Sequence, residues 1–350
     1  MKNLPSPFLT AALAAVIALT GCATSIRPDR DDPEVVQERA LQQAAALTQK
    51  MTLQRRLDRV ATPLLTRNVP SCGADVQSSL GARIANVWSF DEDERVAARQ
   101  EFGVGERLAV LWPMTAQDSS GDRLQRGDVL VSVNGETLGK GQSGVDRMDE
   151  LLRHAPGESR APMQVVVERG GQHAALAIVP TAVCSYPAIV QLSGDFNAYN
   201  DGQKILVNSA LMAFFPEDRD LAVVLGHELA HGTLGHLNKK VWVRVMTGLV
   251  DATFGDTGLV KDHLSAPFFR RYEAEADYAG LYMTAAAGYD VVGAEKVWRE
   301  FGIHTASGTD SLTSTHPASA ERYVALRRTV EEIQALKKTN VSSVAGSAAH

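Results

Sequence analysis

The feature that most constrains this chain is the pentapeptide His-Glu-Leu-Ala-His at residues 227–231, within a segment of helical pattern at 220–234. The two histidines are four residues apart, so both imidazoles lie on one face of a helix. Two neutral imidazoles suit one zinc ion, and a third protein ligand leaves a fourth position for water. Glu228 is placed to act as general base toward that water. The alternative, two unrelated histidines on an exposed helix, fits poorly with the apolar residues that precede them.

The third metal ligand is expected on a later helix. The position that would carry the third histidine of a metzincin site is a leucine, and His236 misses that register by one residue. Glu273 and Asp277 instead share one face of a helix predicted over 266–287. We expect Glu273 to bind the metal and Asp277 to accept the outer N–H of a ligand histidine. The alternative for Asp277 is a carboxylate on the helix surface.

Several motifs occur in order around these residues. They are Asn-Ala-Tyr at 197–199, His-Glu-Leu-Ala-His at 227–231, Glu-Ala-Glu-Ala-Asp at 273–277, Ala-Gly-Tyr-Asp at 287–290 and Ser-Thr-His-Pro at 314–317. Together they resemble the HtpX and CAAX-prenyl-protease family of gluzincin metallopeptidases, and more narrowly its periplasmic lipoproteins with a PDZ-like insert. The resemblance implies one zinc ion per chain, held by His227, His231 and Glu273. It also implies a zinc-dependent endopeptidase that acts on misfolded or misassembled proteins of the bacterial cell envelope.

His316 lies in the Ser-Thr-His-Pro motif, which matches a loop near the active site of that family. The resemblance makes His316 a candidate catalytic residue. An imidazole there could donate to the transition-state oxyanion, or it could occupy the fourth metal position as a removable gate, which we favour. The third alternative is a histidine that caps the final helix, predicted over 318–338.

The first 21 residues predict an export signal. Lys2 gives a positive start, and the apolar run at 8–19 is too short to span a bilayer. Leu-Thr-Gly-Cys at 19–22 resembles the lipobox of bacterial lipoproteins, which implies a lipid anchor on Cys22. Ala23 follows where an aspartate would favour retention in the inner membrane, so we expect the outer membrane, facing the periplasm. An uncleaved anchor is the alternative.

Two cysteines remain once Cys22 carries lipid. Cys72 and Cys184 would lie in an oxidising compartment where disulfides persist, so we predict that they pair. The alternative is a pair of buried free thiols.

A segment of different character, residues 102–183, lies between these cysteines. The expected elements are strands at 107–111 and 128–133, a helix at 145–155 and a hairpin of strands at 163–168 and 173–179. Leu124–Gly135 resembles the core signature of PDZ domains, and 102–105 is a candidate carboxylate-binding loop. This resemblance implies recognition of a substrate or partner by strand addition. The alternative is a module that only packs.

We therefore expect an α+β fold, in which a mainly helical gluzincin zinc-peptidase domain with a small edge sheet is interrupted by a PDZ-like, β-rich module. The expected parts are a signal peptide at 1–21, a tether at 22–33, the N-terminal part of the peptidase domain at 34–101, the insert at 102–183, the zinc-peptidase domain at 184–338 and a disordered tail at 339–350.

Two segments of the peptidase domain have open interpretations. The apolar strand at 205–207 could align substrate by backbone pairing or could be an ordinary sheet edge. Residues 241–264 contain too many charges to span a bilayer and could form a lid or a helix pair in the core.

Charge and chemistry limit the partners. The chain has 35 basic and 41 acidic residues, a net charge of −6, and no block of lysine and arginine, which argues against nucleic acid. We expect protein or peptide substrates, a membrane contact through Cys22 and partner binding by the PDZ-like module. The rival function is a non-proteolytic periplasmic chaperone or assembly factor. Glu228 argues against it, because a structural zinc site needs no base beside an open metal position.

Overall fold

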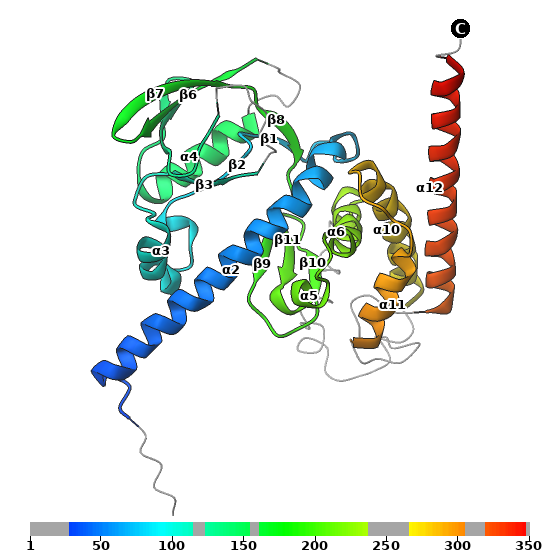
Figure 1. Ribbon diagram of the computed structural model, residues 1–350, viewed down its shortest axis with the longest axis horizontal. Helices are drawn as coiled ribbons and strands as arrows, with labels where there is room; N and C mark the ends of the chain where they lie inside the picture. Colours follow the sequence, from blue (N-terminus) through cyan, green and yellow to red (C-terminus); the bar gives the residue numbers. More distant parts are fainter. Residues whose placement is uncertain (1–27, 115–122, 155–160, 237–265, 305–318, 348–350) are drawn as a thin grey trace, which may run out of the picture. The chain divides into compact units, whose positions relative to one another are not determined.

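The computed structural model describes residues 28–114, 123–154, 161–236, 266–304 and 319–347 (Figure 1). The chain divides into two compact units, Met1–Gln43 and Ala44–His350, and the contacts described below lie in the second. Among the described residues, no helix combines the length and the apolar character needed to cross a membrane. The export signal, Cys22, His316 and residues 241–264 lie outside the described residues.

One long helix, α2 (Pro33–Arg67), is the first element that the structure describes. Its C-terminal half carries apolar residues at helical spacing on one face. The buried members that join the main core are Leu57, Val60, Ala61, Leu64 and Leu65. The same core contains buried residues of the helix that carries the His-Glu-Leu-Ala-His motif, so α2 packs in one core with that helix.

A short antiparallel ladder marks the two ends of the β-rich insert. Strand β1 (Val76–Ser79) pairs with β8 (Thr181–Cys184), and Val76 lies opposite Cys184. A disulfide joins Cys72 to Cys184, with their Cα atoms 5.7 Å apart. The chain that leaves the peptidase domain is therefore tied to its point of return by a ladder and by a covalent bond.

The insert forms a six-stranded sheet with its own apolar core. Its strands are β2 (Ala82–Ala85), β3 (Ala109–Pro113), β4 (Val129–Val133), β5 (Glu136–Thr137), β6 (Met163–Arg169) and β7 (Gln172–Ile178). The order is β2-β3-β4-β6-β7, with β5 beside β4. Buried side chains of these strands share a cluster with Met148 of helix α4 (Gly141–His154).

One expected boundary of this insert was wrong. Its sheet begins before residue 102, because β2 pairs with β3. The four residues of β2, Ala-Arg-Ile-Ala, show too little alternation to be recognised as a strand. The candidate carboxylate-binding loop at 102–105 comprises the end of helix α3 (Arg95–Phe102) and the residues after it, and its role stays a prediction. Gly103 caps that helix with a φ of 63°, and Val104 is buried beside α2 and α3.

The peptidase domain contains a second, three-stranded sheet. Strand β11 (Ile205–Asn208) lies between β10 (Ala198–Asn200), its antiparallel neighbour, and β9 (Ala188–Gln191), its parallel neighbour. The strand expected at a sheet edge is therefore central, and β10 is the outer strand among those that the structure describes. All four residues of β11 are buried, which is typical of a strand covered on both faces and explains its continuous apolar run.

Helices enclose the site beside this sheet. They are α5 (Ser209–Phe214), α6 (Asp218–Thr233), α10 (Ala266–Ala286), α11 (Ala294–His304) and α12 (Ala320–Ser347). The expectation of disorder from residue 339 was wrong for the described residues, because α12 continues to Ser347. The sequence supplies no glycine or proline between Lys338 and Gly346, so nothing stops the helix at the expected place.

Candidate metal centre

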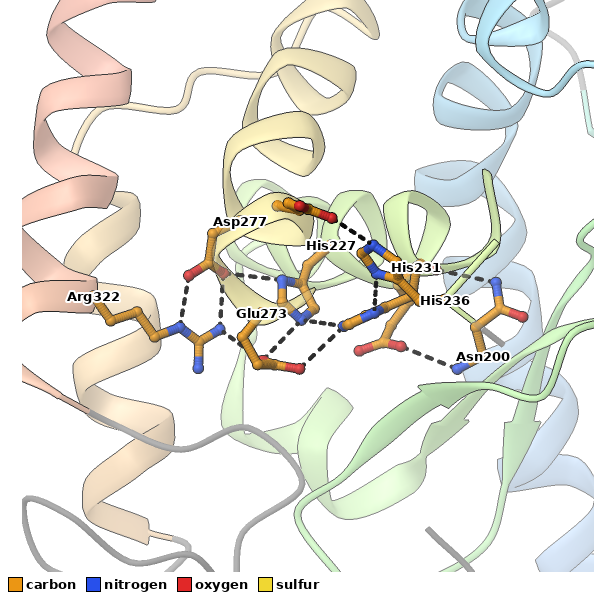
Figure 2. A network of polar contacts seen from close by, with 9 residues as sticks. Asn200, His227, His231, His236, Glu273, Asp277 and Arg322 are labelled. Carbon is orange, nitrogen blue, oxygen red and sulfur yellow. Dashed lines mark hydrogen bonds and ion pairs between the residues drawn. The ribbon is translucent and has the colours of Figure 1, made fainter. Parts of the chain in front are cut away.

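Three potential metal ligands converge between α6 and α10 (Figure 2). His227 and His231 of α6 and Glu273 of α10 are each at most 4% exposed. One ligand atom from each lies within 4.8 Å of the others. The Nε2 atoms of the two histidines are 3.0 Å apart, and the Glu273 carboxylate oxygens lie 3.4 Å from His227 Nε2 and 3.2 Å from His231 Nε2. The structure thus brings together the three ligands that the sequence predicted.

Small residues allow these two helices to approach closely. A Cβ atom built on Gly226 would lie 2.6 Å from the Gly280 carbonyl oxygen, and one built on Gly280 would lie 2.8 Å from His227 Cα. Real Cβ atoms do not come so close, so both positions require glycine. The close approach places Glu273, two turns before Gly280 on α10, opposite the histidines.

Asp277 and Arg322 support the first histidine from outside the ligand set. His227 Nδ1 lies 2.9 Å from Asp277 Oδ1, so it can donate to this carboxylate and keep Nε2 directed toward the ligand cluster. Arg322 of α12 donates to both oxygens of Asp277, from Nε at 2.7 Å and from Nη2 at 2.8 Å. Asp277 therefore lies where the sequence predicted it, whereas no role was predicted for Arg322.

The charges in this cluster shift its pKa values. Burial disfavours the charged form of His227, but Glu273 and Asp277 outweigh it and raise the pKa of His227 to about 9. Burial alone would raise the pKa of Asp277, but Arg322 and His227 lower it. In the absence of metal, His227 is therefore protonated at neutral pH and Asp277 is ionised. Metal binding at His227 must displace that proton.

Asn200 of strand β10 fixes Glu228. The Asn200 backbone N–H donates to Glu228 Oε2 at 3.0 Å, and its side-chain Nδ2 donates to the Glu228 carbonyl at 3.0 Å. Both residues are buried. The sequence motif at 197–199 stopped one residue short of this contact, which depends on the pairing of β10 with β11.

A third histidine, which the sequence analysis excluded as a metal ligand, lies next to the second ligand. His236 Nδ1 is 3.0 Å from His231 Nδ1, and His236 Nε2 is 3.2 Å from Glu275 Oε2. Burial lowers the pKa of His236, although Glu275 acts in the opposite direction.

The donor set fits one metal ion. Two imidazole nitrogens and one carboxylate oxygen are a ligand combination of catalytic zinc sites, which retain an open position. The fold and this site, with two histidines on one helix, an adjacent glutamate and a ligand from a later helix, define a centre of the metallopeptidase class.

Comparisons with known proteins find similarity to one family of peptidases. The sequence profile of Peptidase family M48 matches residues 166–330. The mitochondrial metalloendopeptidase OMA1 of Arabidopsis thaliana is 35% identical over 127 residues, which cover 34% of this chain and 26% of that protein. The metalloprotease LoiP of Escherichia coli is 29% identical over 147 residues, which cover 38% of this chain and 58% of that protein. These matches support a metallopeptidase of the M48 type.

The similarity is partial in length. The chain spans 26% of the Arabidopsis protein, 58% of LoiP and 44% of the Schizosaccharomyces pombe OMA1, to which it is 29% identical over 150 residues and 40% of its own length. Among solved structures, the HtrA3 PDZ domain bound to a phage-derived ligand is 20% identical, covering 31% of this chain and 88% of that chain, with a TM-score of 0.22.

Proposed function

We propose that this protein is a zinc-dependent endopeptidase of the bacterial cell envelope that degrades misfolded or misassembled envelope proteins. The observation that carries the proposal is the convergence of His227, His231 and Glu273, with Glu228 next to His227 on the same helix. The M48 match and the relatives named metalloendopeptidases support proteolysis. The bacterial relative LoiP is named a metalloprotease and supports the same chemistry.

The ligand residues would hold the metal, and Glu228 would handle the proton. A zinc ion bound by these residues would supply a Lewis acid that activates water and polarises the scissile carbonyl. Glu228 would take the proton from the attacking water and return it to the leaving amine. Asn200 holds the Glu228 carboxylate in one orientation through Oε2.

The location and the role of the insert are also proposals. The lipobox-like sequence at 19–22 supports a lipid anchor on Cys22 and attachment to the outer membrane, facing the periplasm. The signature at 124–135 supports a PDZ-like module that recognises substrates or partners. Replacement of Cys22 by serine should abolish lipid labelling and membrane fractionation, whereas continued partitioning into detergent would indicate an uncleaved anchor.

The decisive experiment compares the mature protein with its Glu228→Gln variant on unfolded envelope proteins, with zinc content measured in both. We expect equal zinc content and loss of degradation in the variant. Equal degradation by both proteins would remove Glu228 from the mechanism. Suppression of aggregation by both, with no cleavage by either, would favour the chaperone alternative.

A further inference from the structure

The end of α6 fixes His236 against the second ligand histidine. The helix closes with the Gly235 N–H donating to the Gly232 carbonyl at 3.0 Å and the His236 N–H donating to the His231 carbonyl at 3.2 Å. This pair of bonds is the Schellman motif, which needs a left-handed residue, and Gly235 supplies it with a φ of 68°. The backbone therefore sets the register between residues 231 and 236.

The side chain of His236 is buried and held from two further sides. It is 4% exposed, and its ring centre lies 4.3 Å from that of Tyr272. Glu275 lies 3.2 Å from His236 Nε2 and accepts a hydrogen bond from Arg271 at 2.8 Å. Figure 2 shows His236 beside His231, on the side of that ring away from Glu273.

Only one arrangement of protons satisfies these contacts when His231 binds metal. His231 Nε2 faces Glu273 and must be unprotonated to act as a ligand, so its proton is on Nδ1. His231 Nδ1 then donates to His236 Nδ1, which places the proton of a neutral His236 on Nε2, facing the Glu275 carboxylate. The opposite arrangement would protonate the ligand atom of His231 and leave His236 Nε2 as an acceptor facing another acceptor.

We propose that His236 is a positioning residue for the metal centre: it accepts the proton of His231 Nδ1 and thereby holds His231 in the tautomer and orientation that bind metal. His236 does for His231 what Asp277 does for His227. Each of these two ligand histidines has a polar partner at its Nδ1 atom, Asp277 for His227 and His236 for His231. The inference rests on the proposed function, in which His231 binds zinc.

The test measures the zinc dissociation constant of the mature protein by competition with a chromophoric chelator. His236→Leu removes the acceptor, whereas His236→Asn keeps an oxygen near the position of Nδ1. We expect roughly a 10- to 100-fold weaker affinity in the leucine variant, the usual effect of losing a partner behind a ligand, and recovery of most of it in the asparagine variant. His173→Leu, which removes an exposed histidine of β7, is the matched control and should bind zinc as wild type does.

Two measurements separate positioning from a general loss of structure. Circular dichroism and thermal unfolding of the metal-free variants report folding. In the zinc-bound wild type, long-range proton–nitrogen NMR correlations should show His231 protonated at Nδ1 and His236 at Nε2. Wild-type affinity in a folded leucine variant, equal weakening by leucine and asparagine, or the reverse tautomers would each overturn the proposal. Failure of the wild type itself to bind zinc would refute the proposed function instead.

Discussion

Arg322 of α12 holds Asp277 of α10 through two parallel hydrogen bonds, with Nε and Nη2 at 2.7 and 2.8 Å from the two carboxylate oxygens. The arginine side chain is 8% exposed and that of Asp277 is 5% exposed. The guanidinium also lies 4.2 Å from the centre of the Trp298 ring of α11. Since Asp277 in turn contacts His227, this ion pair connects α12 and α11 to a metal ligand.

We predict that Arg322→Met destabilises the metal-free protein by about 3 to 5 kcal/mol, because it removes both arginine hydrogen bonds from a buried carboxylate. Arg322→Lys should recover only part of the loss, since an ammonium cannot reproduce the two parallel bonds or the contact with the Trp298 ring. Urea unfolding of the three proteins measures both effects. A change below about 1 kcal/mol in the methionine variant would mean that solvent or another group compensates Asp277.

The pKa of His227 should determine how zinc affinity changes with pH. The pKa of His227 is raised to about 9 by Glu273 and Asp277, and zinc binds only the unprotonated imidazole. The apparent affinity should therefore rise by about tenfold per pH unit as pH increases toward 9 and then level off. Calorimetric titrations at pH 7.5 in two buffers of different ionisation enthalpy should detect about one proton released per zinc bound. Binding without proton release would contradict the assignment of a charged His227.

The sequence predicted the part of the site that depends on residue spacing within one helix. His227 and His231, and likewise Glu273 and Asp277, share helix faces because they are four residues apart. The sequence also indicated α6, α10 and the hairpin of β6 and β7, because their apolar patterns are long enough to be distinctive.

The functional residues that were not predicted from the sequence depend on contacts between distant segments. Arg322, Asn200 and His236 have no local signal for their roles, because each acts across an interface or a helix end that forms only in the folded chain. The central position of β11 is a property of sheet order, which a run of three apolar residues does not specify. Strand β2 has only four residues, and their burial does not alternate. Its pattern therefore did not assign this strand to the insert.

The close contact between α6 and α10 at two glycines predicts that a glycine-to-alanine substitution will destabilise the protein, which is the opposite of its usual effect in a helix. In the interior of a helix, alanine normally stabilises relative to glycine by about 1 kcal/mol. Gly280→Ala should instead destabilise the protein and weaken zinc binding, because its Cβ would lie 2.8 Å from the backbone of His227. Gly105→Ala is the matched control, since nothing lies within 4 Å of a Cβ at that position. Thermal unfolding and zinc competition should separate the two variants; equal behaviour would show that the helices can move apart without cost.

The disulfide should contribute measurably to the stability of the folded protein. It joins Cys72 and Cys184, which are 112 residues apart, and a cross-link that closes a loop of this size restricts the unfolded chain by about 4 to 5 kcal/mol in the chain-entropy model. We expect reduction of the wild type to lower the free energy of unfolding by about 2 to 5 kcal/mol, the range seen when native disulfides are removed. The Cys72→Ser/Cys184→Ser double variant should start at this lower stability and should not respond to reductant, which separates loss of the bond from other effects of the reagent.

The β1–β8 ladder and the apolar cores remain in the reduced protein, so circular dichroism should still report a folded chain. Urea unfolding with and without reductant makes the comparison, and thiols that react with an alkylating reagent before reduction would show that the bridge is absent.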